Sequence, residues 1–160
     1  MRRIIEAGGG LLGAFLVFTL LHRIHPLAVE VVNVFVAVVL LAGLLGGEIT
    51  GAVMGAVCGL VADSFSVGIF GIAGIALTTM GFYTGFVSRK INVLKAPRLF
   101  VFFVLMAGAE LALWAVLTTL VFGGSVPWSG GVLLLQPVVN ALSATALYAV
   151  YRQWKVRHGG

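Results

Sequence analysis

The residues of this chain with the clearest capacity for chemistry are carboxylic acids set in apolar sequence. Glu110 lies near the middle of the apolar segment from Leu99 to Phe122, where an ionised carboxylate costs at least roughly 2 to 3 kcal/mol in lipid. The carboxyl group is therefore expected to be neutral or paired, with Asn140, Gln136 or Thr118 as candidate partners. Two interpretations stay open: a proton or substrate site, and a hydrogen-bonded contact between helices.

Asp63 ends a series of glycines that recur every four residues: Gly47, Gly51, Gly55 and Gly59. Residues four apart lie on nearly the same face of a helix, so these glycines form a groove that ends at a carboxyl group. In lipid such a groove lets another helix approach closely. That helix belongs to the same chain or to a partner, and a series this long could serve both. Asp63 either accepts backbone N–H bonds in a turn or contacts a partner or ligand.

Other reactive groups are sparse. His22 and His25 are three residues apart, but no acid or cysteine accompanies them, so no metal site is expected. Cys58 is the single cysteine, which excludes a disulfide within one chain. The sequence contains no HExxH motif, no phosphate-binding lysine loop and no recognisable serine–base or paired-aspartate arrangement. We therefore expect neither catalysis nor a cofactor.

Composition places these groups in a membrane protein. Of the 160 residues, 61% are apolar and 9% are charged, and the mean hydropathy is +1.14, which lies far outside the usual range for soluble domains. We predict one all-α domain, residues 1–160, with six transmembrane helices at about 4–21, 27–45, 47–62, 68–87, 99–122 and 132–151. The third helix is short, so it should be shielded by protein. Five helices with a re-entrant segment at 47–62 is the alternative.

The basic residues indicate the orientation of this bundle. The only basic loop, from Ser88 to Arg98, contains Arg89, Lys90, Lys95 and Arg98. An even number of helices puts this loop, both termini and nine of the ten basic residues on one side. The positive-inside rule then places both termini in the cytoplasm and favours six helices over five. The net charge of +5 is thus explained by topology, and no nucleic-acid partner is expected.

A short motif resembles a known family. The segment Gly59-Leu60-Val61-Ala62-Asp63, with Gly71 eight residues after the aspartate, is similar to the GLxxD…G signature of MreD, a family of bacterial rod shape-determining membrane proteins. The basic loop after the fourth helix and Val138-Val139-Asn140 in a final helix with a basic end are also similar. Val67 and Thr145 depart from the family pattern, which frequently has glycine and proline at these positions.

The resemblance implies a fold and a role. The fold is a six-helix bundle like the S subunits of energy-coupling-factor vitamin transporters, located in the bacterial cytoplasmic (inner) membrane. The role is that of a non-enzymatic scaffold of the cell-elongation complex, which binds MreC and works beside RodA, a class B penicillin-binding protein and MreB in peptidoglycan synthesis. On this view the glycine series, Asp63, Gly68 and Gly71 pack helices or bind the membrane helix of MreC. The basic loop would face cytoplasmic partners or anionic membrane lipid.

A transport function is the alternative. An S subunit of a vitamin transporter shares the helix count, and its small polar pocket could be lined by Glu30, Asn33, Asp63, Glu110 and Asn140. Such subunits usually have small-residue motifs on the first helix for their coupling partner, of which Gly9 and Gly13 are only a faint version. Long outer loops that would cover a bound vitamin are also missing. The sequence therefore favours the scaffold.

Overall fold

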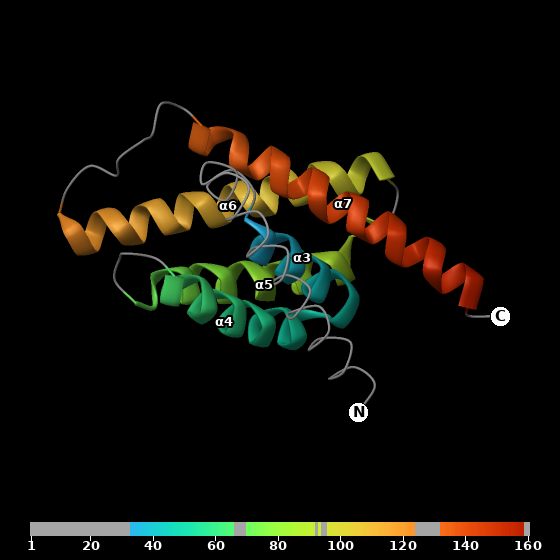
Figure 1. The fold of residues 1–160 in the computed structure, drawn as a ribbon, viewed down its shortest axis with the longest axis horizontal. Coiled ribbons are helices and arrows are strands. Elements are labelled where there is room, and N and C mark those ends of the chain that lie inside the picture. Colours follow the sequence, from blue (N-terminus) through green and yellow to red (C-terminus); the bar gives the residue numbers. More distant parts are fainter. Residues whose placement is uncertain (1–32, 66–69, 92, 94–95, 124–131, 159–160) are drawn as a thin grey trace.

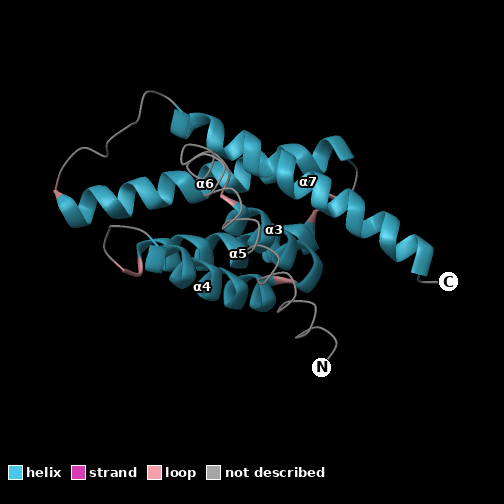
Figure 2. Cartoon of the chain, in the orientation of Figure 1, coloured by secondary structure: helices cyan, strands magenta, loops and turns pink. Residues whose placement is uncertain are grey.

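The computed structural model of this chain describes residues 33–65, 70–91, 93, 96–123 and 132–158. Every regular element in these ranges is a helix, as expected from the sequence (Figure 2). The helices are α3 (Val34–Gly46), α4 (Glu48–Phe65), α5 (Ile72–Lys90), α6 (Ala96–Phe122) and α7 (Val132–His158) (Figure 1). The expected first helix, 4–21, and the expected beginning of the second lie outside the described residues.

Three of the described helices contain stretches long and apolar enough to cross a membrane: Glu48–Phe65, Pro97–Val121 and Leu134–Arg157. Together with the apolar composition, these stretches indicate a membrane protein. Helix α3 is apolar but has only 13 residues, or about 20 Å, against about 30 Å for a hydrocarbon core. The count of six transmembrane helices and the cytoplasmic orientation of both termini stay predictions.

The connection between α3 and α4 differs from the expected boundaries. Asn33, expected within a helix, stands at the N-cap of α3, where its side chain accepts a hydrogen bond from the Val36 N–H at 3.4 Å. Gly47 alone separates α3 from α4, with φ +87°. This backbone conformation is accessible mainly to glycine, so Gly47 breaks the helix instead of beginning the next one.

The turn between α4 and α5 is also shifted. Helix α4 continues through Phe65, so Asp63 and Ser64, expected in the turn, are helical. Helix α5 begins at Ile72 after Gly71, which has φ +108° at the N-cap. Gly68, the expected first residue of this helix, lies outside the described residues. The carboxylate of Asp63 is the reason that α5 starts where it does, as the hydrogen bonds below show.

Helix α3 is the central element of the described bundle. It contacts α4 and α5 on one side and α7 on another, with a smaller contact to α6 (Figure 1). Its largest fully buried side chains belong to the main hydrophobic core and are Phe35, Val36, Val39 and Leu40. From the sequence we expected helix 47–62 to be the short helix that other helices shield from lipid. In the structure the short and most enclosed helix is α3, because its apolar side chains contact neighbouring helices on several sides.

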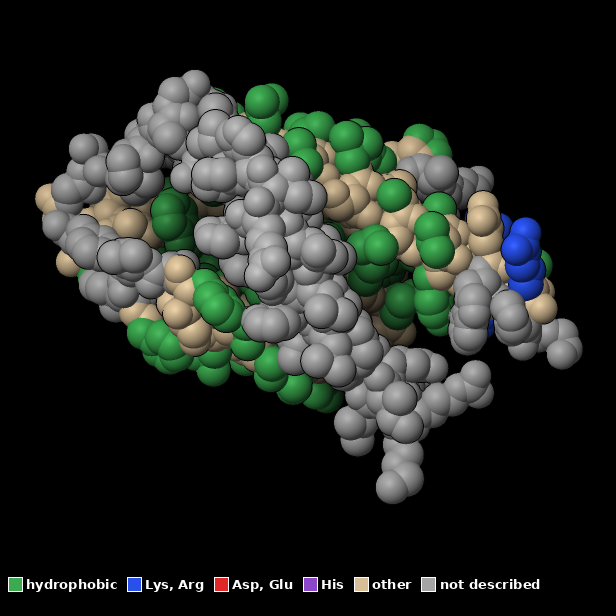
Figure 3. Space-filling model, viewed as in Figure 1, with side chains coloured by type: hydrophobic (Ala, Val, Ile, Leu, Met, Phe, Trp, Pro, Cys, Tyr) green, Lys and Arg blue, Asp and Glu red, His purple; other side chains and the backbone are tan. Residues whose placement is uncertain are grey.

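The outer surface of the bundle is largely apolar. Figure 3 shows hydrophobic side chains over much of the described surface in one view, and Lys and Arg side chains at the end where α7 finishes. Exposed apolar residues occur on every described helix, and the most exposed include Ile49, Leu105, Leu120 and Leu134. Exposed apolar surface on this scale fits contact with lipid.

Candidate functional site

The glycines of α4 lie against the backbone of α5. A Cβ atom at each of three glycines would overlap backbone atoms of α5. The pairs are Gly51 with Gly81, Gly55 with Leu77, and Gly59 with Gly74. Because the partners descend along α5 as the glycines ascend α4, the two helices are antiparallel, and they share the most extensive contact between described helices.

Helix α3 joins this contact through another glycine. A Cβ atom at Gly43 would lie 2.8 Å from the carbonyl oxygen of Gly81, and one at Gly51 would lie 2.9 Å from the Gly43 Cα atom. Three helices therefore meet with almost no side chains between them. At these positions the groove expected from the sequence is filled by the same chain, which leaves no room there for a helix of another protein.

Asp63 closes one end of the α4–α5 hairpin. The Asp63 carboxylate accepts hydrogen bonds from three backbone N–H groups near the N-terminus of α5: Gly71 at 2.9 Å, Ala73 at 3.1 Å and Gly74 at 3.0 Å. The side chain is buried, and the positive end of the α5 dipole favours a negative charge there. Of the two roles considered for Asp63, local satisfaction by backbone N–H groups is the one that the hydrogen bonds provide.

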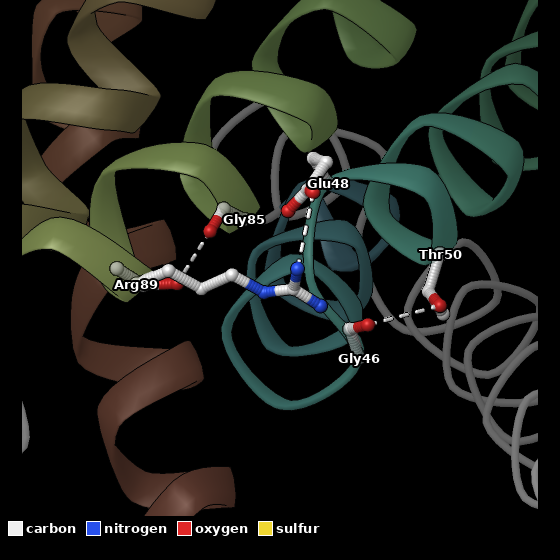
Figure 4. A network of polar contacts seen from close by, with 6 residues as sticks. Gly46, Glu48, Thr50, Gly85 and Arg89 are labelled. Atoms are coloured by element: carbon white, nitrogen blue, oxygen red, sulfur yellow. Dashed lines mark hydrogen bonds and ion pairs between the residues drawn. The ribbon is translucent and has the colours of Figure 1, made fainter.

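Arg89 and Glu48 close the other end of the hairpin (Figure 4). The Arg89 Nη1 atom donates to Glu48 Oε1 at 3.1 Å, with 62% and 28% of the side chains exposed. The guanidinium also occupies the place that a Cβ atom at Gly47 would need, and a Cβ atom at Gly85 would overlap the backbone at Gly47 and Glu48. Gly47 is thus constrained by its conformation and by its neighbours.

Asn140 links the C-terminal helix to the beginning of α3. Its Oδ1 atom accepts a hydrogen bond from the Asn33 backbone N–H at 2.9 Å, and the side chain is 1% exposed. This contact joins residues 107 positions apart. A polar residue expected in a pocket or beside Glu110 therefore ties two helices together.

Glu110 is buried on α6, with 7% of its surface exposed. None of its expected partners is seen to bond with it within the described part of the chain. Thr118 Oγ1 is buried and has no hydrogen-bond partner there, and Asn140 Oδ1 is used by Asn33. The structure does not bring Asp63 and Glu110 into one hydrogen-bonded group with Asn33 and Asn140, as a common polar pocket would require. Glu30 lies outside the described residues.

The basic loop residues occupy different environments. Arg89 is paired with Glu48, and the Lys90 amine lies 4.3 Å from the centre of the Phe86 ring. Arg98 is exposed in the first turn of α6. Lys95 lies outside the described residues. The expectation of a loop is wrong for these three residues, since Arg89 and Lys90 belong to the last turn of α5 and Arg98 to α6. They contribute one ion pair within the bundle and at least two exposed cations.

The described residues form no grouping suited to metal chemistry. No set of three His, Cys, Asp or Glu side chains among them could hold a metal ion, and His22 and His25 lie outside the described ranges. Cys58 is a buried free thiol. What the described polar residues visibly do is fix helix ends: Asp63 for α5, Asn33 and Asn140 for α3, and Glu48 with Arg89 for the hairpin.

Some of these contacts had a sequence signal that was missed. The glycine series extends back by one step to Gly43, which identifies the third helix at the contact. An antiparallel hairpin also brings an acid at the start of one helix, Glu48, near a base at the end of the next, Arg89. The Asn33–Asn140 contact has no such signal, because nothing local relates residues so far apart.

Comparison of the chain with known protein families, with curated proteins and with solved structures finds no match.

Proposed function

We propose that this protein is a non-enzymatic scaffold of the MreD family, with six spans in a bacterial cytoplasmic membrane and both termini in the cytoplasm. The observation that carries the proposal is the contact between Asp63 and Gly71. These residues are the fixed points of the GLxxD…G motif, and their spacing of eight lets the carboxylate accept the Gly71 N–H. The first glycine of the motif, Gly59, packs on Gly74 in the same hairpin.

The geometry supports a role in binding other membrane proteins. The motif residues stabilise a rigid hairpin, and the exposed surface consists mainly of apolar helix faces. On this proposal the protein helps to maintain rod shape by binding MreC. RodA, a class B penicillin-binding protein and MreB belong to the same complex, and the chain contributes surfaces that position peptidoglycan synthesis.

The contact with MreC is proposed on the outer face of the α4–α5 hairpin, since the glycine face is already occupied. Exposed apolar residues follow one another along α4 at helical spacing: Ile49, Val53, Val57 and Leu60. Beside them lies a shallow groove between the helices, lined by residues that include Ala56, Gly74, Ile75 and Thr78. Small residues in this groove would let a single transmembrane helix approach closely.

Purification of the tagged full-length protein in a mild detergent, followed by identification of the proteins bound to it, tests the scaffold. The expected partner is MreC, a protein with one span and an extracytoplasmic coiled coil, accompanied by wall-synthesis enzymes. Recovery of two cytoplasmic ATPases and a membrane coupling subunit would instead establish the transport function.

A photo-crosslinking residue tests the proposed surface. Placed at Val57, on the outer face of α4, it is expected to form an adduct with MreC. The matched control is the same residue at Leu105, which is exposed on α6. Adducts at Leu105 and none at Val57 would keep the scaffold but refute the α4–α5 surface.

A further inference from the structure

One end of the described bundle has an excess of positive charge. Helix α5 finishes there, α6 begins there after a short connection, and α7 finishes there (Figure 1). The basic side chains at this end are Arg89, Lys90, Arg98, Arg152, Lys155 and Arg157. The one acid at this end of the described helices, Glu48, is paired with Arg89. We call the other five basic residues the basic end; no ion pair joins them to any described residue.

The last part of α7 extends away from the rest of the bundle. Helix α7 has 27 residues, or about 40 Å, which exceeds a hydrocarbon core of about 30 Å by several residues. Arg152, Lys155 and Arg157 in its final turns are all exposed, and Figure 3 shows the Lys and Arg side chains gathered there. A helix that leaves the hydrocarbon region with three cations carries them into the layer of lipid headgroups.

Lys90 reaches the same layer from α5. Its amine lies over the exposed ring of Phe86, which stacks on the exposed ring of Phe82 with 6.1 Å between the ring centres. The amine therefore lies against an exposed aromatic ring one helical turn before the end of α5, and the apolar stem of a lysine suits such a place near the membrane interface. No ion pair joins Lys90 to a described acid.

We propose that the basic end binds the phosphate headgroups of anionic phospholipids in the leaflet that it faces. Arginine guanidinium groups match phosphate oxygens in bidentate geometry, and lysine supplies a compact charge. An acidic protein could also complement this charge. Lipid is favoured because Lys90 adjoins an exposed aromatic surface and the α7 cations lie in the last turns of a segment apolar enough to span a membrane. The proposal goes beyond the scaffold and does not depend on the identity of its partner.

Tryptophan fluorescence can test this preference in the full-length protein. Replacing Trp114 and Trp128 with Phe leaves Trp154, within the last turns of α7, as the only tryptophan. The variant is placed in phosphatidylcholine vesicles that contain brominated phosphatidylglycerol or brominated phosphatidylcholine. Bromine quenches a nearby tryptophan, so the two titrations compare the affinities for the two lipids. We expect phosphatidylglycerol to be favoured, by up to about fivefold for each basic residue in contact.

Charge variants separate an electrostatic site from general contact with lipid. Arg152→Gln, Lys155→Gln and Arg157→Gln together are expected to remove most of the preference, whereas Arg152→Lys with Arg157→Lys keeps the charge and should retain it. Raising the salt from 0.1 to 1 M, which shortens the Debye length from about 10 to about 3 Å, should also weaken it. Equal quenching by the two lipids in the parent variant would overturn the proposal. A preference unchanged by neutralisation or by salt would overturn it too.

Discussion

Two of the described helix pairs, α4–α5 and α6–α7, are held together in different ways. Helices α4 and α5 meet backbone to backbone at glycines, and polar contacts close the pair at both ends. Helices α6 and α7 meet through side chains of mixed size, with Phe103 and Ala107 buried on α6 and Ala144 buried on α7. The first pair is fixed by atoms that cannot be rearranged by a change of rotamer, whereas the second can adjust its side chains.

This difference distinguishes contacts that require an exact geometry from contacts that can adapt. Where helices meet through backbone atoms, a Cβ atom added at a glycine is not tolerated, because the backbone atoms that it would overlap cannot move away by a change of rotamer. Contacts through Phe, Leu and Ala side chains absorb small changes of shape at moderate cost. The α4–α5 hairpin is therefore suited to present a constant outer face, and the α6–α7 pair is suited to absorb changes of side-chain shape.

The largest expected effect comes from adding a side chain at the glycine contact. Gly55→Leu would drive a Cβ atom into the carbonyl group of Leu77 and the Cα atom of Thr78, and we expect it to destabilise the fold by about 3 kcal/mol or more. The matched control is Gly108→Leu on α6, where no described atom lies within 4 Å of the added Cβ. Unfolding in a detergent titration measures both. Equal losses at the two positions would remove the distinction between the helix pairs.

The second effect tests the closure of the hairpin at Asp63. Asp63→Ala leaves the three N–H groups of Gly71, Ala73 and Gly74 without their acceptor, and we expect a loss of about 2 to 3 kcal/mol. Hydrogen exchange at these three amides should accelerate more than exchange elsewhere in α5. Ser64→Ala, which removes an exposed hydroxyl bonded to the Leu60 carbonyl, is the control. Protection that survives in Asp63→Ala would mean that another group caps α5.

The smallest effect is expected at the opposite end of the hairpin. Glu48→Gln, Arg89→Gln and the double variant form a cycle whose interaction energy should be at most about 1 kcal/mol, because the pair is partly exposed. The value should fall with added salt. A second cycle that pairs Glu48→Gln with Lys90→Gln should give no coupling, since Lys90 lies over Phe86 instead. A coupling energy above about 2 kcal/mol between Glu48 and Arg89 would mean that this ion pair stabilises the hairpin as much as the hydrogen bonds of Asp63 do.

The parts of the structure that the sequence could indicate are those with local signals. The glycine series and Asp63 predict a close hairpin with its carboxylate near the turn, and α4 and α5 have this arrangement. All the information lies within Gly47 to Gly74, where helical spacing alone determines which residues share a face. The motif that resembles MreD falls in the same segment, so its geometry could be anticipated while its biological role could not.

The remaining features depend on neighbours that are distant in sequence. The apolar pattern predicted a second helix, 27–45, that runs through Asn33, because a single polar residue in an apolar run does not identify a helix cap. The burial of α3 follows from contacts with α4, α5 and α7, none of which its own residues specify. Which residue bonds to Glu110 also depends on tertiary contacts that its neighbours in sequence do not specify. No described residue forms a hydrogen bond or an ion pair with it.

The hydrogen bond between Asn33 and Asn140 has a consequence for biosynthesis. Asn140 is the 107th residue that a ribosome adds after Asn33. During that interval the backbone N–H of Asn33 has no access to the acceptor that it uses in the finished protein. The beginning of α3 is therefore among the last contacts to be completed, after the hairpin next to it has all of its own residues. A chain that stops before α7 would contain every residue of the hairpin and would lack the acceptor of the Asn33 N–H group at the beginning of the central helix.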